Sequence, residues 1–137
     1  MELTNPINIS VSIIIVNYRT PSLTLACIDS IYAHTKGIDF EVIVVDNHSE
    51  DDSVERLSKD NRIILIESSR NGGFGYGNNL GMKVARGKYF FLLNSDTLLV
   101  NNAIKEFYDY AESHEPKTLY GCYLIGDDGT YRGSFHY

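Results

Sequence analysis

Two acidic side chains stand where they could do chemistry, each just after a run of apolar residues. Asp46 follows residues 42–45, and Asp96 follows residues 90–93 and the pair Asn94-Ser95. A carboxylate at position 46 could accept a hydrogen bond from an imide N–H such as that of uracil or thymine. A carboxylate at position 96 could hold Mg²⁺ or Mn²⁺ against a diphosphate, because these ions share protein oxygens with substrate phosphates. Either side chain could instead cap a turn or a helix.

A glycine-rich segment, Asn71-Gly72-Gly73-Phe74-Gly75-Tyr76-Gly77-Asn78-Asn79, lies between these carboxylates. It departs from the G-x-G-x-x-G dinucleotide pattern, since Leu80 stands where the last glycine is required, and from the Walker pattern, since Arg86 stands at another. Its glycines would let the backbone approach a ligand closely, and a helix starting here would favour an anion at its N-terminus. The alternative is a tight turn with close packing of the helix on a sheet.

Short β-branched runs alternate with segments of helical pattern, which predicts an α/β fold: a mostly parallel sheet with helices on both faces. We predict strands over residues 11–16, 40–45, 62–67 and 88–93. The first helix begins with Thr20 as its cap and Pro21 in its first turn, and the others cover 51–60, the glycine-rich segment to Arg86, and 101–114. The apolar stripe predicted for the first helix is Leu23, Cys27, Ile28 and Ile31.

Three further predictions concern the ends of chain segments. Gly87 is expected to end the third helix. A hairpin is expected over residues 118–125 and 130–135, with its turn at Asp127-Asp128-Gly129. Residues 1–10 form an N-terminal extension, and residues 11–137 form one domain.

Polar residues follow each predicted strand, and ligands of parallel sheets bind at the carboxyl ends of the strands. These segments are Asn17-Tyr18-Arg19, Asp46-Asn47-His48-Ser49, Ser69-Arg70-Asn71 and Asn94-Ser95-Asp96. Wet loops would explain any one of them. Four such ends beside a glycine-rich segment favour a binding site.

Composition excludes several classes of function. The 137 residues carry 12 basic and 18 acidic side chains, a net charge of −6, which argues against nucleic-acid binding. No apolar run approaches the roughly 20 residues of a membrane-spanning helix, and no basic secretory start is present. Cys27 and Cys122 form no metal or redox motif, so we expect two buried thiols. A cytoplasmic location follows, with the inner face of the membrane as an option.

Four segments, in their order and spacing, resemble the nucleotide-sugar-binding half of an inverting family 2 glycosyltransferase with the glycosyltransferase A fold, a Rossmann-like nucleotide-binding fold. They are VSIIIVNY at residues 11–18, VVDNHS at 44–49, NGGFGYGNNLG at 71–81 and FLLNSDT at 91–97. The glycine/asparagine segment followed by Leu-Asn-Ser-Asp-Thr is most similar to the rhamnosyltransferase-like branch.

The resemblance implies roles for individual residues. Asn17 and Tyr18 would line the base pocket, Asp46 would hydrogen-bond the pyrimidine, and Asp96 would bind the metal. Asn94 stands where the family's metal motif has its first aspartate. The implied nucleotide-sugar-binding residues are Asn17, Tyr18, Asp46, Asn47, Ser49, Arg70, Asn71, Gly73, Asn78, Asn79, Asn94 and Ser95.

The same resemblance implies partners. The donor would be a UDP- or dTDP-sugar, and the acceptor a glycan or lipid-linked molecule of cell-surface polysaccharide synthesis. No motif identifies the general base, so we expect a donor-binding part whose acceptor half is absent. Missing segments could associate with the membrane periphery, and the aromatic C-terminal region could self-associate. A non-catalytic nucleotide-sugar-binding or assembly module is the alternative. A phospho-receiver domain is disfavoured, because Asn17-Tyr18 stands where it needs an acidic pair.

Overall fold

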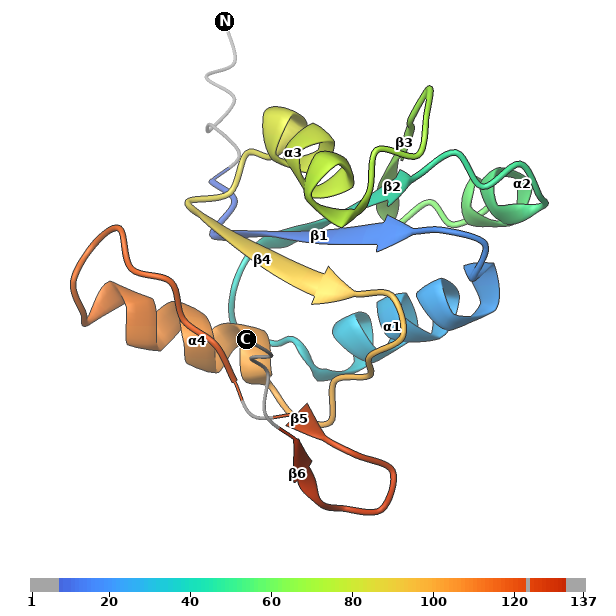
Figure 1. Ribbon diagram of the computed structural model, residues 1–137. Coiled ribbons are helices and arrows are strands. Elements are labelled where there is room, and N and C mark those ends of the chain that lie inside the picture. The colour runs from blue at the N-terminus through green and yellow to red at the C-terminus, as the bar shows by residue number, and fades with distance from the viewer. Residues whose placement is uncertain (1–7, 123, 133–137) are drawn as a thin grey trace, which may run out of the picture.

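The computed structural model describes residues 8–122 and 124–132. Its centre is a four-stranded parallel sheet in the order β3-β2-β1-β4. The strands are β1 (Val11–Asn17), β2 (Phe40–Asp46), β3 (Ile63–Glu67) and β4 (Tyr89–Asn94). All four strands predicted from the sequence are confirmed, and so is the parallel α/β fold class (Figure 1).

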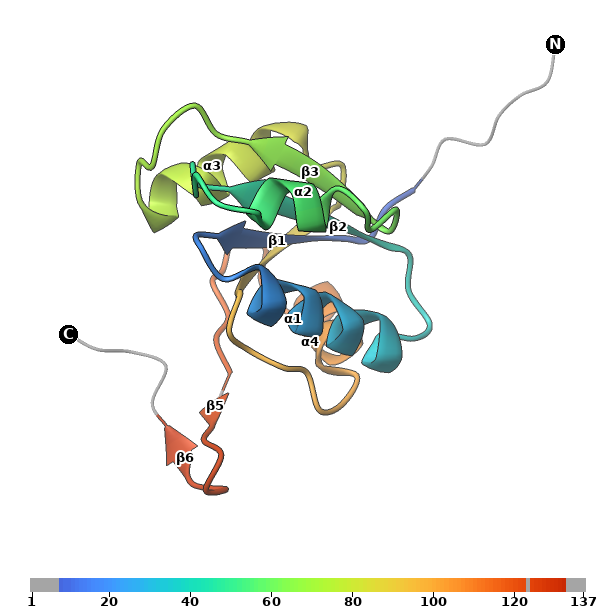
Figure 2. The same cartoon turned by 90° about the vertical axis from the view of Figure 1, so that its right-hand side faces the viewer.

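Helices cover both faces of the sheet, as predicted. Helices α1 (Pro21–His34) and α4 (Ala103–Glu112) lie on one face and α3 (Phe74–Val84) on the other, with the short α2 (Ser53–Leu57) beside α1 (Figures 1 and 2). The face toward α1 buries Ile13, Ile15, Val42 and Val44, and the face toward α3 buries Ile14, Ile43 and Val45. Burial on both sides explains why these strands read as continuous apolar runs.

The structure corrects several details at the ends of the elements. Leu23 is 49% exposed and is not part of the buried stripe of α1. Helix α3 ends at Val84, and Gly87 has a different role: its N–H donates to Ser12 Oγ at 2.8 Å. Thr20 is the cap of α1 by position, but its hydroxyl makes no capping bond. Cys27 is buried as expected, whereas Cys122 is exposed.

Within the described residues, the C-terminal hairpin is much shorter than predicted. Its strands are β5 (Leu124–Ile125) and β6 (Tyr131–Arg132), closed by the Gly126 N–H donating to the Thr130 carbonyl at 2.9 Å. It extends away from the main sheet (Figure 2), and its strands are exposed. A two-stranded ribbon without a packed face gains little stability. The predicted strand residues 133–135 and 123 lie outside the described residues, and self-association through this region remains a prediction.

Ile9 and Ser10 of the predicted N-terminal extension pack on the domain. Ile9 is buried, and its carbonyl accepts from the Lys88 N–H at 3.1 Å.

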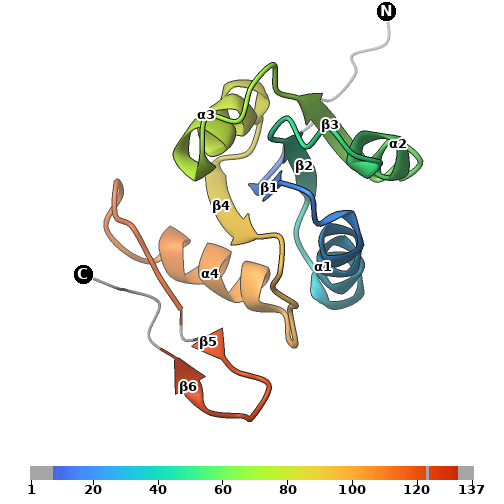
Figure 3. The same cartoon turned by 45° about the vertical axis from the view of Figure 1, so that its right-hand side comes forward.

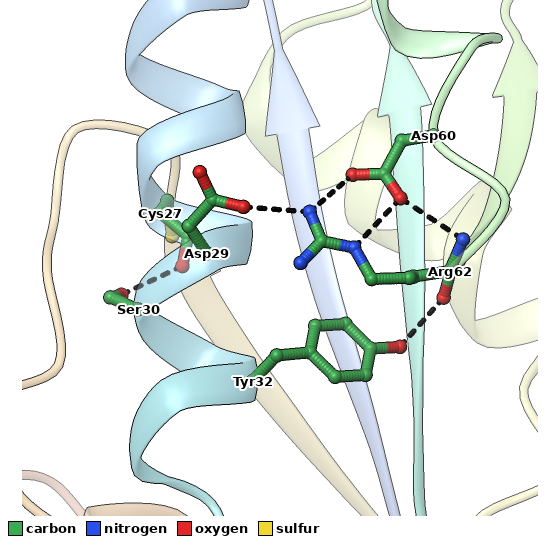
Figure 4. Close-up of polar contacts among 6 residues, drawn as sticks. All are labelled: Cys27, Asp29, Ser30, Tyr32, Asp60 and Arg62. Atoms are coloured by element: carbon green, nitrogen blue, oxygen red, sulfur yellow. Dashed lines mark hydrogen bonds and ion pairs between the residues drawn. The ribbon is translucent and has the colours of Figure 1, made fainter.

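At the opposite side of the sheet from α3, a cluster of side chains around Arg62 connects α1 to the start of β3 (Figure 4). The Arg62 guanidinium contacts Asp29 and Asp60 at 2.7 Å each, and these partners raise its pKa. The Tyr32 hydroxyl donates to the Arg62 carbonyl at 2.7 Å.

Strand β4 is an outer strand of the sheet, and α3 leaves part of it uncovered (Figure 3). Phe90 and Leu92 are 49% and 47% exposed. Leu92 pairs in register with Ile14, so it shares the face on which α3 packs over β1.

No helix in the described ranges combines the length and apolar character that a bilayer span requires.

A buried carboxylate pins the connection between α3 and β4 at the amino edge of the sheet. Glu41 Oε1 accepts from Ser12 Oγ at 2.6 Å and from the Arg86 N–H at 2.7 Å, and Oε2 accepts from the Arg86 guanidinium at 2.9 Å. Burial raises the pKa of Glu41, but the hydrogen bonds from Ser12 and Arg86 outweigh it, so the pKa lies below its ordinary value of 4.5.

Because the pKa of Glu41 is lower in the folded chain than in the unfolded chain, its contribution is present above pH 4.5 and is lost as the pH falls through the folded pKa. We expect Glu41→Gln to lower the free energy of unfolding by about 1–3 kcal/mol at pH 7. As the pH falls below 4.5, the difference in the free energy of unfolding between Glu41→Gln and wild type should shrink. Thermal unfolding between pH 7 and 3 measures this, with the exposed Glu115→Gln as control. A gap that stays constant with pH would contradict the assignment.

Candidate functional site

The polar segments that follow the strands lie at one edge of the sheet. Asn17 at the end of β1 is in register with Asp46 at the end of β2, and Val16 is in register with Asn94 at the end of β4. The sheet order therefore places β1 between the two loops that carry Asp46 and Asp96. The glycine-rich segment leads from β3 into α3 at the same edge (Figure 3).

Asp46 organises the turn that follows β2. It is 3% exposed, and its Oδ1 accepts from Asn17 Nδ2 at 2.8 Å and Ser49 Oγ at 2.6 Å. Its Oδ2 accepts from the Ser49 N–H at 3.0 Å. The hydrogen bonds from Ser49 thus support the alternative that Asp46 caps a turn. A carboxylate offers about four acceptor positions, so a bond to a base N–H at Oδ2 remains open to it and stays a prediction.

Asn17 is fully buried rather than lining an open pocket. Its amide group donates to Asp46, and its Oδ1 accepts from Thr24 Oγ1 at 2.7 Å. In this structure its side chain therefore positions its neighbours. Sequence reasoning did not single out Thr24. The available signal was a threonine at a core position of the α1 stripe, four residues before the buried Ile28.

Asn47 draws the start of α3 to the end of β2. Its Nδ2 donates to Asn71 Oδ1 at 2.8 Å and to the Gly73 carbonyl at 3.2 Å, and Asn71 Oδ1 also accepts from the Gly73 N–H at 3.0 Å. These bonds fix the orientation of the Asn47 amide. They leave Asn47 Oδ1 buried with no hydrogen-bond partner among the described residues, and Asn78 Oδ1 is in the same condition. Thr35 Oγ1 and Ser53 Oγ are likewise buried with no partner among the described residues. Buried groups of this kind are commonly satisfied by ordered water or by a ligand.

Four glycines in and just after the segment divide into two pairs. A Cβ at Gly77 would lie 2.9 Å from Val16 Cγ1, and one at Gly81 would lie 2.5 Å from Ile14 Cγ2, so both allow α3 to approach β1 closely. At Gly73 and Gly75 a Cβ would meet nothing within 4 Å. Close packing therefore accounts for the first pair. The second pair borders open space at the N-terminus of α3, whose cap residue Gly73 has φ 88° and no side-chain capping bond.

Cationic and aromatic side chains are exposed around this edge. The Arg70 guanidinium lies over the Tyr76 ring at 4.8 Å from its centroid, and Tyr18 is 41% exposed. Arg19 Nε donates to the Ser49 carbonyl at 2.9 Å. Asn79 is exposed on the first turns of α3.

Three residues without glycine's freedom adopt the left-handed backbone region here: Arg19 (φ 57°), His48 (φ 60°) and Glu50 (φ 55°). All belong to the loops after β1 and β2. Such conformations cost free energy and concentrate at functional sites. Histidine is enriched in this region among residues other than glycine, but arginine and glutamate carry no such signal in the sequence.

Asp96 is exposed in the loop after β4. Its carboxylate has no hydrogen bond or ion pair with the rest of the described chain, apart from its negative charge acting on Cys27. The pKa of the Cys27 thiol is raised to about 11, mainly because the thiol is buried. A hydrogen bond with Thr97 lowers this pKa, and the negative charge of Asp96 raises it. Ser95 Oγ lies 3.4 Å from Thr20 Oγ1, and Asn94 is exposed.

The donor set limits what Asp96 could do with a metal. Within the described residues, no three His, Cys, Asp or Glu side chains gather into a group that could hold an ion. Asp96 would supply one oxygen ligand, and a hard cation such as Mg²⁺ or Mn²⁺ would need substrate phosphates and water for the rest. An exposed, unpaired carboxylate fits that arrangement.

A hollow of about 340 Å³ lies beside α1 and α2, away from the predicted site. None of the predicted site residues belongs to its lining, which consists of Leu25, Arg56, Lys59, Asp60 and Asn61.

Comparison with known proteins bears on this site. A family model described as glycosyl transferase family 2 matches residues 12–137. Glycosyltransferase GlyG of Streptococcus pneumoniae is 27% identical over 131 residues, which cover 93% of this chain and 42% of GlyG. The E. coli UDP-Glc:alpha-D-GlcNAc-diphosphoundecaprenol beta-1,3-glucosyltransferase WfaP is 32% identical over 128 residues, 91% of this chain and 50% of WfaP. The chain thus spans half or less of these two relatives.

Solved structures share the architecture. S. aureus TarS in complex with UDP-GlcNAc is 26% identical, with a TM-score of 0.66 over 77% of this chain and 32% of TarS. A mannosyltransferase from Pyrobaculum calidifontis, solved with GDP-Man and Mn²⁺, has a TM-score of 0.63 at 23% identity over 71% of this chain and 30% of that chain. The second likeness concerns the fold alone.

Proposed function

Because the chain belongs to glycosyl transferase family 2, we propose that it is the donor-binding part of an enzyme that transfers a sugar from a nucleoside diphosphate to a glycan or lipid-linked acceptor. Its sheet has the glycosyltransferase A architecture. The name of WfaP gives a sugar carried on diphosphoundecaprenol as its acceptor, which supports a role in cell-surface polysaccharide synthesis here. The rhamnosyltransferase-like branch is one candidate within that class.

One observation supports the donor site: the buried amide oxygens of Asn47, just after β2, and of Asn78, in α3, have no hydrogen-bond partner among the residues that the structure describes. A nucleoside supplies the missing donors, an imide N–H on a pyrimidine and hydroxyls on the ribose. Asn47 Oδ1 and the open position on Asp46 Oδ2 are the two acceptors that could receive the imide N–H. UDP- and dTDP-sugars both meet this requirement. The exposed ring of Tyr18 offers the base an aromatic face.

The diphosphate would extend toward positive groups of this edge. The uncapped N-terminus of α3 and the exposed Arg70 favour an anion. Asp96 would hold a divalent cation together with the phosphates, and the Mn²⁺ present in the mannosyltransferase structure supports this choice of ion. When bound, such a cation neutralises charge on the leaving nucleoside diphosphate. Asn94 and Ser95 would position the Asp96 loop.

The names of the relatives also suggest a class of sugar acceptor and a cellular location for this protein. WfaP acts on a diphosphoundecaprenol-linked sugar according to its name, so a lipid-linked acceptor is a candidate here. Such an acceptor would bring the protein to the inner face of the membrane.

Titration calorimetry tests the donor site. UDP or dTDP in the presence of Mn²⁺ is expected to bind with measurable heat, and ADP and GDP more weakly. Absence of heat with both pyrimidine nucleotides would overturn the proposal, and a preference for GDP would overturn the pyrimidine assignment. Release of free UDP from a UDP-sugar on addition of a glycan acceptor would separate a transferase from a non-catalytic binding module.

A further inference from the structure

Asn17 lies between the two loops that the proposed donor would bridge. We infer that the Asn17 amide, held in one orientation by Thr24, is a positioning group that couples the loop after β2 to the loop bearing Asp96. This inference rests on the proposed function, because it assigns the coupling to nucleotide and metal binding. Neither side chain would touch the donor, since both are fully buried.

The orientation of the amide is determined from both ends. Asn17 Nδ2 donates to Asp46 Oδ1 at 2.8 Å and lies 3.4 Å from Ser49 Oγ. Asn17 Oδ1 accepts from Thr24 Oγ1 at 2.7 Å. A flipped amide would set its carbonyl oxygen against the Asp46 carboxylate, which can only accept, so the Nδ2 group must face Asp46 and the Oδ1 atom must face the Thr24 hydroxyl. The Thr24 hydroxyl also lies 3.1 Å from the Thr20 carbonyl, its weaker partner.

The network continues from Asn17 toward β4. Thr20 Oγ1 lies 3.5 Å from Asn17 Oδ1 and 3.4 Å from Ser95 Oγ, next to Asp96 in the chain. The hydrogen bonds to the Asp46 carboxylate are short, at 2.8 Å from Asn17 and 2.6 Å from Ser49, whereas the contacts on the Ser95 side are at the limit of hydrogen bonding. The Asp46 side therefore forms a rigid support. The Ser95 side is joined by contacts that could shorten when a ligand moves the loop.

Two consequences separate this role from simple structural support. A donor bound on the Asp46–Asn47 loop would affect metal binding at Asp96 through Asn17 and Thr20, and by linkage the metal would affect nucleotide affinity to the same degree. The coupling would depend on the Thr24 hydroxyl and not on its methyl group, because the hydroxyl is the group of Thr24 that hydrogen-bonds the amide oxygen of Asn17.

The experiment compares Thr24→Val, which removes the hydroxyl and keeps the shape, with Thr24→Ser, which keeps the hydroxyl and removes the methyl group. Affinity for UDP is measured by calorimetry with Mn²⁺ and with EDTA, and thermal unfolding is recorded for each variant. We expect Thr24→Val to weaken UDP binding about 3–10-fold and to reduce the Mn²⁺-dependent gain, a modest coupling. Thr24→Ser should bind as wild type does even though both variants lose stability.

Each outcome decides the matter. If wild type binds UDP and Thr24→Val binds it equally well, this inference alone is overturned. An equal loss of UDP affinity in Thr24→Val and Thr24→Ser would overturn it too. Wild type that binds no nucleotide would overturn the proposed function as well. If Thr24→Val does not fold, Thr20→Ala tests the Ser95 side. It is expected to reduce the Mn²⁺-dependent gain more than the metal-free affinity, and an unchanged gain would overturn the coupling.

Discussion

Asp96→Asn is expected to remove most of the gain in UDP affinity that Mn²⁺ brings, a loss of about tenfold or more, or ~1.4 kcal/mol. The substitution keeps the size of the side chain and deletes its charge. Within the described residues no other acidic, histidine or cysteine side chains form a metal-binding group with Asp96. The variant would thus leave the cation with phosphates and water as its main ligands.

Calorimetry with and without EDTA checks this result. Metal-free UDP affinity should change little, because Asp96 contacts none of the groups at the Asp46 turn. Asp39→Asn is the matched control: it also removes an exposed carboxylate, but it precedes β2 at the amino edge of the sheet. A variant at position 96 that keeps the full Mn²⁺-dependent gain would refute the metal assignment.

Gly81→Ala is expected to destabilise the fold by about 1–3 kcal/mol, the usual cost of overpacking. Its Cβ would lie 2.5 Å from Ile14 Cγ2, and Ile14 is fully buried at the centre of the sheet. Ile14 Cγ2 is attached at the branched Cβ of a strand residue, so it cannot swing aside freely. Relief would require α3 to lift from the sheet, which would weaken the packing of Leu80 and Met82 on that core.

Gly75→Ala provides the comparison within the same helix. A Cβ there meets nothing within 4 Å, so alanine should leave stability unchanged or raise it by up to about 1 kcal/mol through its helix propensity. Thermal unfolding of the two variants should differ by several degrees, at about 3–5 °C per kcal/mol for a domain of this size. Equal unfolding temperatures would show that α3 does not rely on glycine to approach β1.

The two experiments address different parts of the glycine-rich segment and its surroundings. Gly81 belongs to the packing of α3 on the sheet, and Asp96 to the exposed edge that the packing creates. Loss of stability in one and loss of metal-dependent binding in the other would show that scaffold and site can be altered separately.

Much of this molecule could be predicted from local patterns. Apolar β-branched runs such as Ile13-Ile14-Ile15 require burial on both faces, and that requirement predicts a parallel sheet with helices on each side. The carboxyl ends of parallel strands meet at one edge, so the polar residues after each strand were expected to gather there. Motif order was sufficient to indicate the family, which the family model confirms.

Other features depended on partners that are distant in the sequence. Asn17 was expected at the base pocket from its motif, and only the structure shows that its side chain is buried among Asp46, Thr24 and Ser49. Close packing of the helix on the sheet was the alternative interpretation of the glycine-rich segment, and only the structure shows that Val16 and Ile14 lie against Gly77 and Gly81. Asn47 and Asn78 were already expected at the site, but only the structure shows that their amide oxygens are buried with no hydrogen-bond partner among the described residues. Residue type and spacing determined the elements and their edge; burial and hydrogen-bond satisfaction, which depend on contacts between segments, decided which polar groups serve the fold and which remain open to a ligand.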